Sequence, residues 1–134
     1  MAMTEERPLP SVESKELIPE FEKDLKRLEK KFKHILSDLD VAIEVIRAEP
    51  TNSLRCEQVE GLGESCNDVT AYVLKKFRST DLRSTNELRL VYVYENPKNK
   101  IILVQLYFKG DIQIEEKARI RKYFASNSEF KLSV

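Results

Sequence analysis

The pattern of apolar and polar residues in the first half of the chain predicts a pair of helices. Apolar side chains recur at steps of three and four residues, the period of one helix face, at Phe21, Leu25, Leu28, Phe32 and Ile35 or Leu36. Pro19 suits the first turn of this helix, where its missing N–H costs nothing. A second helix is predicted to start near Ser37 and to stop before Pro50. We expect the two helices to form an antiparallel hairpin.

The second half of the chain is predicted to form three consecutive strands, followed by a helix. The strands cover residues 73–78, 88–94 and 101–109, and a turn at residues 96–99 joins the last two into a hairpin. In the third strand, Ile102, Val104, Leu106 and Phe108 are predicted to share one face, and Ile101, Leu103, Gln105, Tyr107 and Lys109 the other. Short strands are predicted at residues 11–14 and near 56–59, and a last helix at 114–124.

This order of elements predicts an α+β fold. An N-terminal helical hairpin would pack on a small, mainly antiparallel sheet, with a C-terminal helix, and the other sheet face would be left open. We expect a flexible arm at residues 1–10, a single domain at 11–126 and a tail at 127–134. No apolar run approaches a membrane span and no secretory signal is evident, so a cytoplasmic location is expected.

Basic residues within the predicted strands are the main chemical signal. Strand interiors favour β-branched and aromatic side chains, so the cations at Lys75, Lys76, Arg78 and Arg89 call for an explanation. Lys76 and Arg78 are two residues apart and would share one face. If Arg89 meets them across the sheet, the three cations form one patch suited to a phosphate backbone.

The overall charge limits what this patch can do. The 23 basic and 23 acidic residues give a net charge of zero, which argues against indiscriminate binding to nucleic acid. Residues 68–109, however, hold eight basic and four acidic side chains, so positive charge is concentrated where the strands lie. The alternative, without a functional role for these cations, is a solvated sheet face on which they pair with acids such as Glu87 and Glu95.

Metal and redox chemistry find little support. Cys56 and Cys66 could close a disulfide, but two free thiols are favoured in a cytoplasmic protein. The only histidine, His34, is expected on the solvent side of the first helix, and no zinc-binding spacing occurs. The sequence therefore indicates neither a metal nor a cofactor.

The order and spacing of several segments resembles the RelE/ParE family, the toxins of bacterial and archaeal toxin–antitoxin pairs. The likeness covers roughly residues 12–124. It rests on the first helix (21–32), a second helix ending Ala48-Glu49-Pro50, the strand Val73-Leu-Lys-Lys-Phe-Arg78, and the pair Leu88-Arg89-Leu-Val-Tyr92 and Leu106-Tyr107-Phe108-Lys109. The resemblance implies a cognate antitoxin and a target, which is messenger RNA on the ribosome in the cleaving branch and DNA gyrase in the ParE branch. It also leaves open a homodimer or a toxin–antitoxin hetero-oligomer.

Carried over by position, the resemblance implies catalytic roles for Lys76, Arg78 and Arg89. Lys109 matches a basic position at the end of the next strand, and Lys75, Arg83 and Tyr107 are further candidates for RNA binding. In RNA cleavage through the 2′-hydroxyl, Arg78 and Arg89 would hold the phosphoryl charge. Lys76, its pKa lowered by neighbouring cations, would be the base. Tyr107 or Lys109 are the options for the acid, and Tyr107 is also a candidate for stacking on a base.

Two departures from the family favour an alternative function. Cleaving members commonly carry a Tyr or His near the C-terminus, whereas this chain offers only Tyr123, on a predicted helix, and many members are strongly basic. The alternative is a non-catalytic protein of the same fold, either a gyrase inhibitor or an inactive toxin that pairs with an antitoxin. An unrelated α+β interaction domain is a third possibility.

Overall fold

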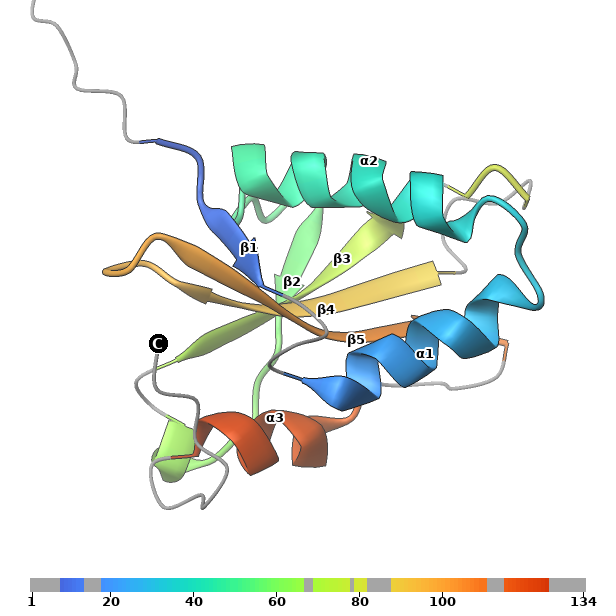
Figure 1. Cartoon of the computed structure of the whole chain (residues 1–134). Helices are drawn as coiled ribbons and strands as arrows, with labels where there is room; N and C mark the ends of the chain where they lie inside the picture. The colour runs from blue at the N-terminus through green and yellow to red at the C-terminus, as the bar shows by residue number, and fades with distance from the viewer. Residues whose placement is uncertain are drawn as a thin grey trace, which may run out of the picture.

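A computed structural model gives the fold of the chain (Figure 1). It describes residues 8–13, 18–66, 69–77, 79–81, 88–110 and 115–125, without the side chains of Ser65 and Lys76. The predicted arm at 1–10 and tail at 127–134 therefore lie largely or wholly outside the described residues. Along the chain the elements are β1 (Ser11–Glu13), α1 (Pro19–Glu29), α2 (Ile35–Ala48), β2 (Cys56–Gln58), the 3₁₀ turn η1 (Glu64–Cys66), β3 (Thr70–Phe77), β4 (Leu88–Glu95), β5 (Lys100–Phe108) and α3 (Lys117–Phe124).

The strands form one five-stranded sheet in the order β1-β5-β4-β3-β2. Only β1 runs parallel to its neighbour, and the other three pairings are antiparallel. The turn between β4 and β5 closes through the Asn99 N–H and the Asn96 carbonyl, 3.0 Å apart, with Asn99 at a positive φ of 49°. The predicted α+β fold, mainly antiparallel with a C-terminal helix, is confirmed.

The helices α1 and α2 run in roughly opposite directions, but they meet at a different point from the one predicted (Figure 1). Pro19 lies in the first turn of α1 as expected, whereas α1 ends at Glu29 and α2 already begins at Ile35. Phe32, 4% exposed, packs into the core from the connection between them. Because this apolar residue in the turn continues the helical period, the sequence pattern predicts a first helix that extends past the residue where α1 ends.

The alternation predicted for β5 fails halfway along the strand. Tyr92 pairs with Leu103 and Val91 with Gln105, so Val104 is an extra residue opposite this step of β4. Such a bulge reverses the faces of the residues before it, and Leu103 therefore shares a face with Leu106. Residues 101–107 are all at most 4% exposed. Because both faces of this strand are buried, its apolar residues carry no signal of the shift.

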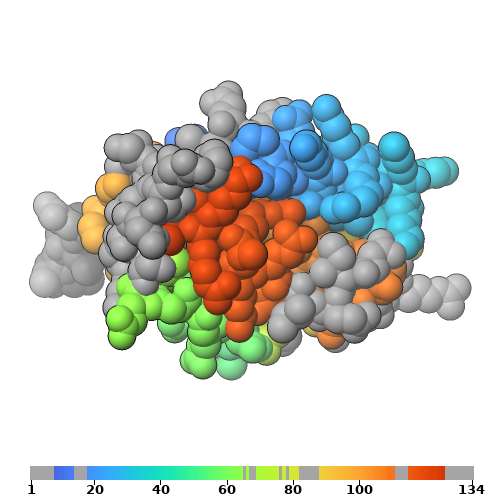
Figure 2. Space-filling model, turned by 90° about the horizontal axis from the view of Figure 1, so that it is seen from below, coloured from blue at the N-terminus to red at the C-terminus, as the bar shows by residue number. Residues whose placement is uncertain are grey.

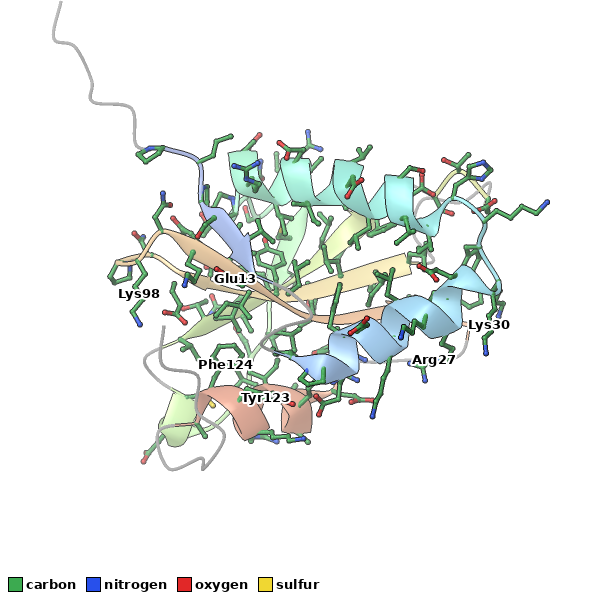
Figure 3. The ribbon with its side chains drawn as sticks, in the orientation of Figure 1. Glu13, Arg27, Lys30, Lys98, Tyr123 and Phe124 are labelled. Carbon is green, nitrogen blue, oxygen red and sulfur yellow. The ribbon has the colours of Figure 1, made fainter. Side chains whose placement is uncertain are left out.

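The helix α3 lies on the opposite side of the sheet from α2, so the second face is not left open as expected (Figures 1 and 2). Tyr123 and Phe124 lie on the side of α3 that faces the sheet (Figure 3), and they are 6% and 2% exposed. The Glu116 N–H donates to Oε1 of the buried Gln105 at 2.8 Å. The C-terminal helix thus covers part of the face where the strand cations were expected. None of the described helices has the length and apolar character that crossing a bilayer requires.

A buried ion pair binds backbone groups at the edge of β5, beyond the three residues of β5 that pair with β1. Asp24 of α1 accepts the Leu106 N–H at 3.1 Å, and Arg119 of α3 donates to the Val104 carbonyl at 2.9 Å. Arg119 Nη1 and Asp24 Oδ2 are 2.6 Å apart, with side chains 8% and 3% exposed. Burial opposes the charge of Arg119, but the hydrogen bond and charge of Asp24 outweigh it and raise the pKa of the guanidinium. The two side chains thus supply the hydrogen-bond partners that a neighbouring strand would otherwise provide.

A second contact joins α1 to α3 nearer the surface. Glu20 accepts a hydrogen bond from Lys122 Nζ at 2.8 Å and another from the Tyr123 hydroxyl. Burial alone would raise the pKa of Glu20, but these two hydrogen bonds and the charge of Lys122 lower it from 4.5 to about 2. The contact therefore stabilises the fold only while Glu20 is ionised.

Replacing Asp24 by Ala is expected to lower the free energy of unfolding by about 3 kcal/mol, because Arg119 would stay buried with only the more exposed Glu116, 3.3 Å from Nη2, as an ionic partner. The Leu106 N–H would also lose its acceptor. Urea unfolding measures the change. Glu22→Ala is the matched control, since Glu22 is 41% exposed and its nearest cation, Lys26, lies 3.8 Å away. The control should change stability by about 0.5 kcal/mol or less; equal effects of the two variants would contradict the assigned role of Asp24.

The folded protein is also expected to lose stability as pH falls from 4.5 to about 2, in part because Glu20 is protonated over this interval. Its folded pKa is below the unfolded value, so its contribution is complete above 4.5 and absent below about 2. Urea midpoints across this range should fall less steeply for Glu20→Gln than for the wild type. Lys122→Gln should give an intermediate slope, because Tyr123 still donates; identical slopes for all three proteins would refute the contact.

Candidate functional site

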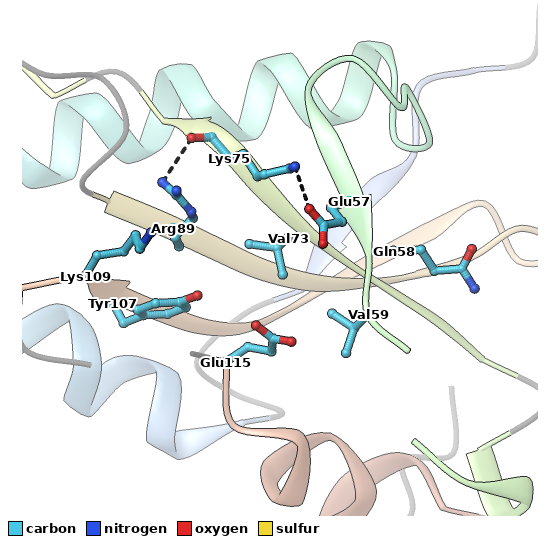
Figure 4. A pocket seen from close by; sticks show the side chains of 9 residues that line it. All are labelled: Glu57, Gln58, Val59, Val73, Lys75, Arg89, Tyr107, Lys109 and Glu115. Carbon is cyan, nitrogen blue, oxygen red and sulfur yellow. Dashed lines mark hydrogen bonds and ion pairs between the residues drawn. The ribbon is translucent and has the colours of Figure 1, made fainter. Parts of the chain in front are cut away.

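Four of the seven residues predicted for the site line one cavity. Lys75, Arg89, Tyr107 and Lys109 surround a space of about 220 Å³ on the sheet face that α3 partly covers (Figure 4). The other three cannot be placed in this way. Arg78 and Arg83 lie outside the described residues, and for Lys76 only the backbone, within β3, is described. The predicted meeting of Arg89 with Lys76 and Arg78 therefore stays a prediction.

A bulge in β3 brings its lysines opposite Arg89. Leu74 pairs with Leu90 and Phe77 with Leu88, so β3 has one more residue than β4 over this interval. Leu74 and Phe77 are 1% and 0% exposed. These two side chains fill the core on the helix-hairpin side, and the backbone of residues 75–76 faces the position of Arg89. The bulge thus brings the backbone of Lys75 within hydrogen-bond distance of Arg89.

Hydrogen bonds and an ion pair hold the cavity cations in place. Arg89 Nη1 donates to the Lys75 carbonyl at 3.1 Å and to the Leu88 carbonyl at 3.3 Å. Lys75 Nζ lies 2.5 Å from Oε2 of Glu57 on the edge strand β2 (Figure 4). The two cations are therefore oriented before any ligand arrives, which lowers the entropic cost of binding an anion.

Two carboxylates in the cavity were missed in the sequence. Glu57 comes from β2 and Glu115 from the residues just before α3, and both line the cavity. The hydrogen bond from Lys75 and its charge lower the pKa of Glu57, and Arg89 contributes in the same direction. A strand was expected near residues 56–59, but only its register, with Glu57 opposite Val73, brings Glu57 beside Lys75. No pattern in the sequence points to Glu115.

Tyr107 presents its hydroxyl to the cavity rather than an open ring face. The residue is 4% exposed, which leaves little ring surface for stacking on a base, and Figure 4 shows its hydroxyl directed inward. Burial and the charge of Glu115 raise its pKa to about 12, while Arg89 acts in the opposite direction. The hydroxyl therefore remains protonated at neutral pH and can donate a proton or a hydrogen bond.

His34 and the cysteines lie elsewhere and serve the fold. His34 precedes α2 rather than lying within the first helix; its backbone N–H and Nδ1 contact the Asp81 carboxylate at 2.8 and 2.9 Å. Cys56 and Cys66 are buried free thiols, as favoured, and Cys56 Sγ lies 3.0 Å from the Tyr92 hydroxyl. Among the described residues, no group of three or more His, Cys, Asp or Glu side chains could hold a metal.

The cavity is expected to bind polyanions through its cations, with a salt dependence that reports each contact. For single-stranded RNA, Arg89→Met should reduce the slope of log affinity against log salt by about 0.7, because one phosphate contact is lost. Fluorescence anisotropy with a labelled oligonucleotide measures the slope. Arg47→Met is the control: Arg47 lies in α2 and bonds Pro10 and Glu44, away from the cavity. A wild-type slope for Arg89→Met would exclude a phosphate contact by Arg89.

Comparison with known proteins assigns the chain to no family. No protein-family model, curated protein or solved structure matches it. The likeness to the RelE/ParE toxins therefore rests on the order and spacing of residues in the chain itself. Function has to follow from the cavity.

Proposed function

We propose that the protein is a RelE-like toxin that cleaves messenger RNA on the ribosome and thereby inhibits translation. One observation carries the proposal. Lys75, Arg89, Tyr107 and Lys109, chosen from the sequence for RNA chemistry, line a single cavity. Cations fixed on a sheet and a protonated hydroxyl are the groups that a metal-independent cleavage at a phosphodiester needs. The enzyme would be an endoribonuclease of the mRNA-interferase type.

In the proposed reaction the cations bind the scissile phosphate. The 2′-hydroxyl of the preceding nucleotide attacks phosphorus, and negative charge grows on the non-bridging oxygens. Arg89 takes this charge, because its planar guanidinium can grip two oxygens and never loses its proton. Lys75 and Lys109 add positive charge along the RNA backbone. Arg78 has the same proposed role as Arg89, and Arg83 the same role as Lys75 and Lys109, but both arginines lie outside the described residues.

Tyr107 is the proposed general acid, and Lys76 is the base predicted from the sequence. A tyrosine whose pKa is raised to about 12 stays protonated until the leaving 5′-oxygen acquires charge. Its hydroxyl faces the cavity beside Arg89, its partner in the strand register. The side chain of Lys76 is outside the described part of the structure, so its role stays a prediction.

The second candidate is a non-catalytic protein of the RelE/ParE type that inhibits gyrase or only pairs with an antitoxin. The observation in its favour is the mixed charge of the cavity, where Glu57 and Glu115 oppose three cations. Two carboxylates weaken the binding of an anionic backbone.

Both candidates call for a cognate antitoxin. An apolar groove of about 350 Å³ between α1 and α2 offers it a place to dock. The described residues that line the groove are Phe21, Leu25, Leu36, Leu39, Asp40, Ile43 and Leu103, and Asp40 is the only charged residue among them. A helix with apolar side chains at spacings of three and four would fit such a groove.

Programmed ribosomes with a defined message in the A site test the first candidate. The wild-type protein should cut the message, and Arg89→Ala should slow single-turnover cleavage by about 10²–10³-fold, since one donor to the transition-state charge is lost. Arg47→Ala should cleave at the wild-type rate, because Arg47 is distant from the cavity. A wild-type protein that leaves the message intact but inhibits gyrase supercoiling would favour the second candidate.

A further inference from the structure

Four functional groups form a row across four neighbouring strands. Tyr107 on β5 pairs with Arg89 on β4, Arg89 hydrogen bonds to Lys75 on β3, and Lys75 pairs with Glu57 on β2. The order is hydroxyl, guanidinium, ammonium and carboxylate. Three strand spacings separate the two ends of the row, about 14 Å at the backbone. Both end groups face the cavity between them (Figure 4).

Cleavage of RNA through its 2′-hydroxyl needs the groups in such an order. The nucleophile enters on one side of phosphorus and the leaving oxygen departs on the other, so base and acid must stand on opposite sides. The groups that hold the phosphoryl charge belong between them. Here the two cations, Arg89 and Lys75, occupy the middle of the row, with Tyr107 at one end and Glu57 at the other.

We propose that Glu57, rather than Lys76, is the general base of the cleavage reaction. The inference rests on the RNA-cleaving function proposed above and gives it its missing partner to Tyr107. Glu57 takes the 2′-hydroxyl proton as the 2′-oxygen bonds to phosphorus. The bond from phosphorus to the 5′-oxygen breaks, and Tyr107 gives its proton to that oxygen. The products are a 2′,3′-cyclic phosphate and a 5′-hydroxyl; solvent then takes the proton from Glu57 and returns one to Tyr107.

The surroundings of Glu57 suit this role. Its side chain is 64% exposed, so an RNA strand can reach it without any opening of the fold. One carboxylate oxygen, Oε2, bonds Lys75, and the charge of Arg89 acts on the same carboxylate. The bond from Lys75 lowers the pKa of Glu57, which keeps the carboxylate ionised at neutral pH but makes it a weaker base than a glutamate without this partner.

Glu115 is the less suitable carboxylate of the two. Its charge raises the pKa of Tyr107, which places it on the acid side of the row, beside the leaving oxygen. It comes from the residues before α3 rather than from the sheet. A base at this end would stand on the same side of phosphorus as the acid, where the 2′-oxygen does not enter.

Removing the carboxylate should slow cleavage without weakening binding. Glu57→Gln keeps an oxygen for Lys75 but cannot take a proton at neutral pH. Single-turnover cleavage on programmed ribosomes should slow by about 10²–10⁴-fold. The affinity for a message blocked by a 2′-O-methyl group should stay equal or rise, because a negative charge leaves an anion site. Glu60→Gln, which removes the same charge from an exposed residue outside the cavity lining, should leave both values unchanged.

A message with sulfur at the 5′-bridging position separates base from acid. Sulfur departs without a proton, so the defect of Tyr107→Phe should largely disappear on this substrate, while that of Glu57→Gln should persist. Wild-type cleavage by Glu57→Gln, or an equal loss for Glu57→Gln and Glu60→Gln, would overturn the assignment of the base. So would a full loss in Lys76→Met combined with normal cleavage by Glu57→Gln. If the wild-type protein cuts no message, the proposed function itself fails, and the assignment falls with it.

Discussion

The buried pair of Asp24 and Arg119 is the interaction on which the arrangement of the whole sheet depends. It joins α1, β5 and α3 at one point, because the two side chains bond each other and the backbone of β5 at Val104 and Leu106. Without it, the edge beyond β1 would present unpaired donors and acceptors to water or to another chain. With it, α3 is held against the sheet, and Glu115, just before α3, lines the cavity.

The strands that line the cavity bury apolar side chains on one face and carry charged side chains on the other. Leu74 and Phe77 of β3 lie in the core, and Lys75 next to Leu74 lines the cavity. Arg89 has Leu88 and Leu90, both 0% exposed, as its neighbours in β4. Because core packing fixes these strands on one side, the charged groups on the other face are held at set distances. Such rigidity is what electrostatic stabilisation of a transition state requires.

The sequence allowed the element order, the fold class and half of the cavity to be predicted, for reasons that differ by residue. Arg89 and Lys75 stood out because cations are unusual inside strands. The end of α1 was missed because Phe32 extends the helical period through a turn, and the bulge at Val104 because both faces of the strand around it are buried. Glu57 was missed for a third reason. Its place beside Lys75 follows from the pairing of β2 with β3, which no local pattern encodes.

The shortness of β2 has a consequence for how a substrate would be accommodated. The strand β2 has only three residues, Cys56–Gln58, with one further backbone bond to β3 at each end, from Val59 and to Arg55, and it is the outermost strand on that side of the sheet. A strand of this kind can detach and re-form without unfolding the rest, since few backbone bonds must break. Glu57 is thereby carried on a short edge strand, which opens more readily than the centre of the sheet. Bound RNA would hold this strand in place, and its amide protons should then exchange with solvent more slowly.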